Sequence, residues 1–184
     1  QRVLLIDCDL RKGHIHRMFN ISPESKGISN LLARESTASE CIVQTSIPGL
    51  SFIPRGKIPP NPSELLMHPN FTDFLDAVCQ QFDLVLIDTP PLLAVTDAAI
   101  VGRLAGTSLI VTRFGRNSVS EIQLTVRRFA QNGITIKGAI FNGLEKRASV
   151  YGKYGGYGYG YGYGYGGYSY YQYDYKSDNN EHKK

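Results

Sequence analysis

Five short apolar runs mark the first 150 residues of the chain, at positions 3–6, 50–53, 84–87, 108–112 and 136–141. Within each run the apolar side chains follow one another with little polar alternation, which is typical of strands buried on both faces of a sheet. Each run therefore predicts one strand of a central sheet.

Helical spacing of apolar residues fills the intervals between these runs, at positions 28–34, 63–67, 70–81, 97–104 and 118–131. The segment 48–62 is rich in Pro and Gly, which favours a strand followed by an exposed loop over a helix. Because strands and helices alternate, the pattern predicts an α/β fold of three layers with a mainly parallel sheet.

The composition changes abruptly near Val150. All 12 tyrosines lie between Tyr151 and Tyr175, whereas all 8 phenylalanines precede Val150. Glycine alternates with tyrosine there, and ordering so much glycine is entropically costly, so we expect a disordered tail at 151–184 after one domain at 1–150. The alternative is a self-associating Gly-Tyr segment that acts as a structural adhesive.

Charge and cysteine content exclude some classes of function. The net charge of +4 is spread over both segments, which gives no support to nucleic-acid binding. Three scattered cysteines form neither a CxxC metal site nor a disulfide framework, which favours a reducing, cytoplasmic location. No apolar run reaches the ~20 residues that cross a bilayer. The abrupt start at Gln1, directly before an apolar run, favours a fragment that is truncated at its N-terminus.

Acidic residues follow two of the predicted strands. The sequence VLLIDCDLR places Asp7 and Asp9 two residues apart, on one side of an extended chain, and LVLIDTPP places Asp88 at the end of another strand. An acidic residue at a strand end is often only a turn former or a helix cap. If the two strands are neighbours, however, the three carboxylates converge at one solvent-facing edge of the sheet, where ligands of open α/β sheets bind. The pattern then predicts a magnesium-nucleotide site.

These motifs carry a resemblance to a known family. VLLIDCDLR and LVLIDTPP resemble the Walker A′ and Walker B motifs of the bacterial tyrosine kinases, or BY-kinases, and PPNPSELL at 59–66 resembles a further segment of that family. The tyrosine cluster narrows the resemblance to the Wzc-like polysaccharide co-polymerases of Gram-negative bacteria. The resemblance covers the whole chain and implies a P-loop NTPase-like fold. No G-x-x-x-x-G-K-[ST] motif is present, so we expect this chain by itself to bind ATP poorly.

The resemblance also implies roles for individual residues, with ATP and Mg²⁺ as cofactors. Asp7 would be the base for the tyrosine hydroxyl, while Asp9 and Asp88 would hold Mg²⁺. Arg11 would contact a phosphate or pair with an acidic group at a subunit contact. Asn142 would contact the adenine, although an Asn-Gly pair is first of all a turn signal. The expected phosphorylation sites are Tyr157, Tyr159, Tyr161, Tyr163, Tyr165, Tyr168, Tyr170, Tyr171, Tyr173 and Tyr175.

The intact relatives of such a chain would act on the cytoplasmic face of the inner membrane. The resemblance implies a ring-shaped homo-oligomer in which one subunit phosphorylates the tail of the next, a cognate tyrosine phosphatase, and a role in polysaccharide polymerisation and export. The rival hypothesis is a MinD- or ParA-like ATPase switch, which uses the same Walker residues and phosphorylates no protein. Such a switch has no use for clustered tyrosines, which favours the kinase.

Overall fold

The computed structural model describes residues 1–144. In chain order its elements are β1 (Val3–Asp7), the 3₁₀ helix η1 (Ile15–Phe19), α1 (Ile28–Leu32), α2 (Ala38–Cys41), β2 (Val43–Gln44), β3 (Leu50–Ile53), α3 (Pro62–Met67), α4 (Pro69–Cys79), β4 (Leu84–Asp88), α5 (Asp97–Leu104), β5 (Ser108–Arg113), α6 (Val119–Gln131) and β6 (Ile136–Asn142). The boundary expected near Val150 and the tyrosine tail lie outside the described residues.

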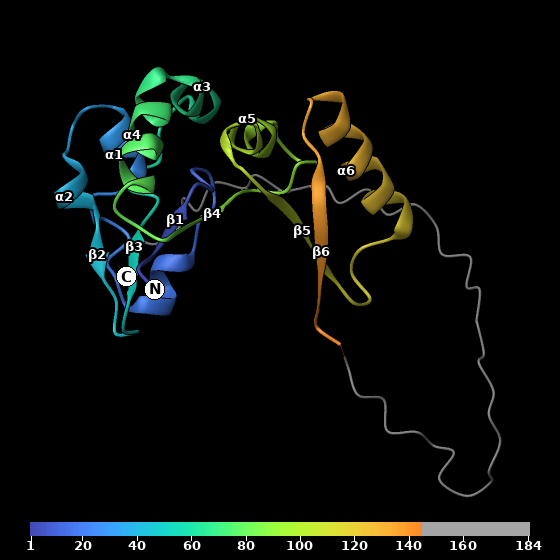
Figure 1. Cartoon of the computed structure of the whole chain (residues 1–184), viewed down its shortest axis with the longest axis horizontal. Helices are drawn as coiled ribbons and strands as arrows, with labels where there is room; N and C mark the ends of the chain where they lie inside the picture. The colour runs from blue at the N-terminus through green and yellow to red at the C-terminus, as the bar shows by residue number, and fades with distance from the viewer. Residues whose placement is uncertain (145–184) are drawn as a thin grey trace, which may run out of the picture. The chain divides into compact units, whose positions relative to one another are not determined.

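Strands β2, β3, β1 and β4 form one sheet in that spatial order (Figure 1). The pairs β1–β3 and β1–β4 are parallel, and only the two-residue edge strand β2 runs antiparallel. Strands β5 and β6 form a second, parallel pair. All five strands expected from the apolar runs are present, and the prediction of mainly parallel pairing is confirmed.

The core of the four-stranded sheet lies mainly under α1 and α4. Leu4 and Ile6 of β1 are fully buried there and belong to one apolar cluster with Phe71 and Val78 of α4. On the other face, Phe52 of β3 stacks at a tilt on Phe19 of η1, with ring centroids 5.1 Å apart. On this second face Val3 and Leu5 of β1 are partly buried, so β1 has apolar residues on both faces of the sheet.

Helix α5 connects this core with the region of α6 and β6. Val101 of α5 packs into the main cluster, whereas Ala98 and Ala99 pack with Ile134 and Phe129. A side chain at Gly102 would have its Cβ 3.1 Å from Ile134 Cδ1, so glycine permits this close approach.

Strands β4 and β5 each have an edge that pairs with no other strand within residues 1–144, as do the other outer strands, β2 and β6. Leu86 of β4 is 46% exposed and Val111 of β5 is 62% exposed, which is unusual for apolar residues of parallel strands. No helix in the described part of the chain is both long and apolar enough to span a membrane.

Candidate functional site

The acidic ends of β1 and β4 lie side by side. The register aligns Asp7 with Asp88, and the backbone N–H of Cys8 donates to the Asp88 carbonyl at 2.9 Å. The condition on which the expected convergence of the carboxylates depended, namely that these two strands are neighbours, is therefore met. Both acidic residues stand at the carboxyl edge of the sheet, where parallel strands release their chain into loops that can hold a ligand.

We expected the side chain of Asp7 to face solvent at the edge of the sheet, and this expectation is wrong. Asp7 is 0% exposed, and its carboxylate accepts the backbone N–H groups of Asp9 at 3.2 Å and Ile15 at 3.3 Å. The loop that follows β1 folds back over it, and a Cβ at Gly13 would collide with both carboxylate oxygens. Glycine at position 13 is what allows the loop to close over Asp7.

Burial and neighbouring charge alter the protonation of this carboxyl. Desolvation and the nearby Asp88 raise the pKa of Asp7 from 3.8 to about 6, although the two backbone N–H groups act in the opposite direction. The pKa of Asp88 is raised as well, first by partial desolvation of its carboxyl and then by the negative charge of Asp9. Unlike Asp7, Asp88 keeps part of its surface exposed to solvent. The site thus concentrates negative charge that the fold leaves uncompensated, a condition that favours uptake of a proton or a cation.

Asp9 occupies the turn after β1. Its Oδ1 accepts the backbone N–H of Arg11 at 3.1 Å and of Lys12 at 2.8 Å, and its carbonyl accepts the N–H of Gly13 at 2.8 Å. These bonds fix the orientation of the carboxylate relative to the loop. Asp9 lies on the loop after the strand, as its position in the sequence predicted. The alternative interpretation of Asp9 as a turn former is also correct, because its side chain accepts two backbone N–H groups of the turn.

A cation would find oxygen ligands here, but not a complete cage. Within residues 1–144, no three His, Cys, Asp or Glu side chains are already grouped as a metal site. Mg²⁺ usually keeps several waters and binds through one or two carboxylates together with substrate phosphates, so Asp9 and Asp88 fit this requirement.

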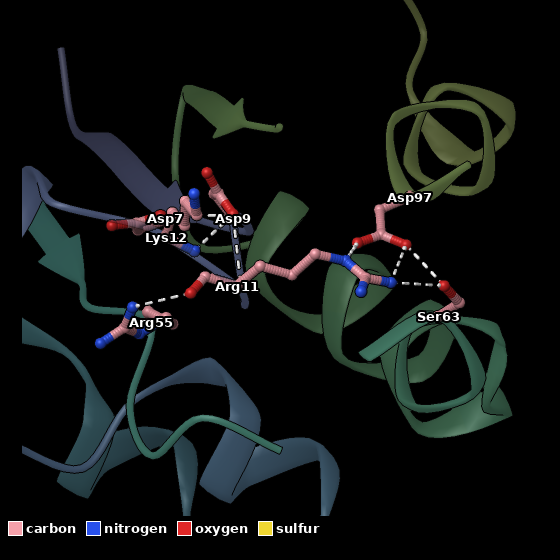
Figure 2. Close-up of polar contacts among 7 residues, drawn as sticks. All are labelled: Asp7, Asp9, Arg11, Lys12, Arg55, Ser63 and Asp97. Carbon is pink, nitrogen blue, oxygen red and sulfur yellow. Dashed lines mark hydrogen bonds and ion pairs between the residues drawn. The ribbon is translucent and has the colours of Figure 1, made fainter. Parts of the chain in front are cut away.

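Arg11 lies beside the site, with its side chain directed away from Asp7 and Asp9 (Figure 2). Its Nε donates to Asp97 Oδ2 at 2.8 Å, and its Nη2 donates to Asp97 Oδ1 at 3.3 Å and to Ser63 Oγ at 3.1 Å. The acidic partner therefore belongs to the same chain, and the phosphate contact expected for Arg11 stays a prediction. Sequence reasoning missed Asp97 altogether; Ser63 was noticed only as part of PPNPSELL.

Asn142 ends β6 and forms a local turn. Its Oδ1 accepts the backbone N–H of Gly143 at 2.7 Å, and Gly143 has a positive φ of 69°. This geometry agrees with the turn interpretation of the Asn-Gly pair. The adenine contact stays a prediction, as do the ten tyrosines, which lie outside the described residues.

Comparison with known proteins gives relatives for this arrangement. The family model described as "AAA domain" matches residues 1–133. Tyrosine-protein kinase wzc of Salmonella typhimurium is 49% identical over 157 residues, which are 85% of this chain and 22% of the relative. Tyrosine-protein kinase etk of Escherichia coli K12 is 48% identical over 154 residues, which are 84% of this chain and 21% of the relative. The chain thus spans about a fifth of the length of these relatives.

Solved structures agree with this result. The kinase domain of Escherichia coli tyrosine kinase ETK superposes with a TM-score of 0.77 at 47% identity, covering 88% of this chain and 61% of that domain. The cell division ATPase MinD of Pyrococcus furiosus superposes with a TM-score of 0.62 at 19% identity, over 76% of this chain and 58% of MinD. The second likeness concerns the fold alone.

Proposed function

Because the chain belongs to the AAA-domain family and, within it, to the bacterial tyrosine kinases related to Wzc and Etk, we propose that it forms part of a kinase domain that transfers phosphate from ATP to tyrosine. The observation that carries this proposal is the alignment of Asp7 with Asp88 at the carboxyl edge of the sheet, with Asp9 on the adjoining turn. This arrangement concentrates carboxylates where the phosphates of a nucleotide would lie.

The three carboxylates have separable roles in this proposal. Asp9 and Asp88 hold Mg²⁺, directly or through water, and the bound ion offsets the negative charge of the β- and γ-phosphates. Asp7, with its pKa raised to about 6, accepts the proton of the tyrosine hydroxyl. Since Asp7 has no exposed surface, the part of the loop at 13–15 that lies over its carboxylate has to move before a hydroxyl can reach it.

The phosphate-binding part of the site is expected outside this chain. No G-x-x-x-x-G-K-[ST] motif occurs in it, and the chain covers 61% of the ETK kinase domain. We expect the strand that leads into the phosphate loop to pair with the free edge of β4, beside Asp88. The exposed Leu86 on that edge supports this placement, because pairing would bury it.

The acceptors in this proposal are the clustered tyrosines of residues 157–175. In this proposal the acceptor tyrosines of one subunit are phosphorylated at the site of a neighbouring subunit in a ring. We use the term natural-length protein for the longer protein that also contains the expected phosphate loop. We further propose that it works at the cytoplasmic face of the inner membrane, with a cognate phosphatase and the polysaccharide export machinery as partners. A MinD-like ATPase switch is the alternative, and it is disfavoured by the low identity to MinD and by the tyrosine cluster.

One experiment tests the kinase against the switch. The natural-length protein is incubated with ATP and Mg²⁺, and phosphotyrosine is mapped by mass spectrometry alongside a measurement of ATP hydrolysis. Asp88→Asn should remove the signal, whereas Asp83→Asn, a matched change just before the same strand, should leave it intact. ATP hydrolysis without any phosphotyrosine would overturn the kinase proposal in favour of the switch.

A further inference from the structure

Three side chains from distant parts of the chain form a closed polar network beside the carboxylates. The guanidinium of Arg11 donates to both oxygens of Asp97, at 2.8 and 3.3 Å. The hydroxyl of Ser63 accepts from Arg11 Nη2 at 3.1 Å and donates to Asp97 Oδ1 at 2.6 Å. We call this set the Arg11–Ser63–Asp97 brace; Figure 2 shows it spanning the gap between the β1 loop and two helices.

The brace links three elements that otherwise approach the site independently. Arg11 belongs to the loop after β1, Ser63 to the first turn of α3, and Asp97 is the first residue of α5. Helices α3 and α5 also pack against each other. Since α5 follows the loop that leaves β4 after Asp88, the brace ties the loops of both acidic strands to one point.

Asp97 is well suited to serve as the fixed point of this brace. It is 0% exposed, and its position at the beginning of a helix favours a negative charge. A bidentate pairing of guanidinium and carboxylate is directional as well as strong, so it holds Arg11 in one orientation. The side chain of Arg11 is only 28% exposed, which limits its screening by water.

The backbone of Arg11 transmits this restraint to Asp9. The N–H groups of Arg11 and Lys12 both donate to Asp9 Oδ1, so a shift of Arg11 also shifts the carboxylate. On the carbonyl side, Arg55 Nη1 donates to Arg11 O at 3.5 Å, near the limit of a hydrogen bond. Arg11 is thus held by its side chain and by both sides of its backbone.

We propose that Arg11, Ser63 and Asp97 are positioning residues that fix the turn carrying Asp9, and that Arg11 acts on the reaction through Asp9 and not as a phosphate ligand. The proposal rests on the proposed kinase function. It assigns a part to Asp97, to which no motif pointed, and to Ser63, which the motif PPNPSELL contains without a role of its own. The proposal predicts that Asp97→Asn and Arg11→Ala have the same effect on the Mg²⁺ requirement, because each substitution breaks the same restraint.

The test uses the natural-length protein with Arg11→Ala, Asp97→Asn, Ser63→Ala, and the double variant of Arg11 and Asp97. Removal of a residue that orients a metal ligand typically lowers metal affinity about 10–100-fold. Arg11→Ala and Asp97→Asn should therefore each need at least about tenfold more Mg²⁺ for half-maximal phosphorylation, with little change in KM for ATP. The double variant should resemble either single variant, and Ser63→Ala should show a smaller effect.

A second readout is independent of activity. Amide hydrogen exchange of the peptide spanning residues 9–15, followed by mass spectrometry, should become about tenfold faster in Asp97→Asn, because the loop loses its anchor. The matched control is Asp83→Asn, which breaks the exposed Arg2–Asp83 pair of 2.9 Å at the opposite ends of β1 and β4. That variant should leave exchange at 9–15 unchanged.

The outcomes separate the alternatives. If Arg11→Ala raises KM for ATP while Asp97→Asn does not, Arg11 is a phosphate ligand and the proposal is wrong. Unchanged exchange at 9–15 in Asp97→Asn would also overturn it. If the unaltered protein forms no phosphotyrosine, the proposed function fails, but the exchange measurement still decides whether the brace holds the loop.

Discussion

Replacing Asp7 by Asn should make the protein more stable at neutral pH. The folded chain keeps this carboxyl buried at 0% exposure next to Asp88, which raises its pKa from 3.8 to about 6. A raised carboxyl pKa means that folding favours the protonated form. Stability from this group is therefore greatest at acidic pH and falls as the pH rises from about 4 to about 6.

The magnitude follows from the size of the shift. At about 1.4 kcal/mol per pKa unit, ionised Asp7 lowers the free energy of unfolding by about 3 kcal/mol at pH 7. An Asn side chain removes the charge, but its amide group can accept only one of the two N–H groups of Asp9 and Ile15, which costs about 1 kcal/mol. The expected net gain is about 2 kcal/mol.

Urea unfolding of the chain followed by circular dichroism measures this effect. The gain of Asp7→Asn over the unaltered chain should be near its full value at pH 7 and should be lost by about pH 4. Below that pH only the hydrogen-bond cost of about 1 kcal/mol remains, so the variant should then be the less stable chain. Asp83→Asn is the control, since its pairing with Arg2 lowers the pKa of Asp83 and its loss should stabilise nothing. A variant at position 7 that is less stable than the unaltered chain at pH 7, or a gain independent of pH, would refute the reasoning.

The remaining predictions concern activity and the loop. In the natural-length protein, Asp7→Asn and Asp88→Asn should each abolish tyrosine phosphorylation while circular dichroism stays unchanged; near-normal signal would remove that residue from the site. Gly13→Ala should lower the free energy of unfolding by about 1–3 kcal/mol, because its Cβ runs into Asp7, whereas Gly106→Ala, with nothing within 4 Å of its Cβ, should not. The chain of 184 residues should show no kinase activity by itself; robust ATP-dependent phosphorylation by it would contradict the expected need for a separate phosphate loop. A kinase-dead natural-length protein that retains its tyrosines should be phosphorylated by an active partner without a tail; absence of label would mean that each tail serves its own subunit.

The strands were predictable because burial on both faces leaves a signal that needs no partner information. The apolar run at 84–87 corresponds to β4. The next residue, Asp88, ends this strand and aligns with Asp7, as expected for neighbouring parallel strands. Three short elements, η1, α2 and β2, were missed, since five, four and two residues are too few to establish a period.

The burial of Asp7 and the Arg11–Ser63–Asp97 brace were beyond sequence reasoning for a different reason. Arg11 and Asp97 are 86 residues apart, and Arg11 and Ser63 are 52 apart, so their contact depends on how α3 and α5 pack. Local patterns identify which side of a strand a residue faces, but not which later segment covers it. The position of Gly13, six residues after Asp7, was the available hint that the loop returns over the carboxylate.

Asp7 and Asp97 are both fully buried acids, and the difference between their partners separates their roles. Asp97 receives two N–H groups of a guanidinium and one hydroxyl, so its charge is neutralised within the fold. The backbone N–H groups at Asp7 are outweighed by burial and by Asp88, which leaves its pKa raised. A carboxylate with uncompensated charge takes up a proton or a nearby cation more readily than one already paired. For this reason we propose that Asp7 takes the proton and that Asp97 positions the turn carrying Asp9.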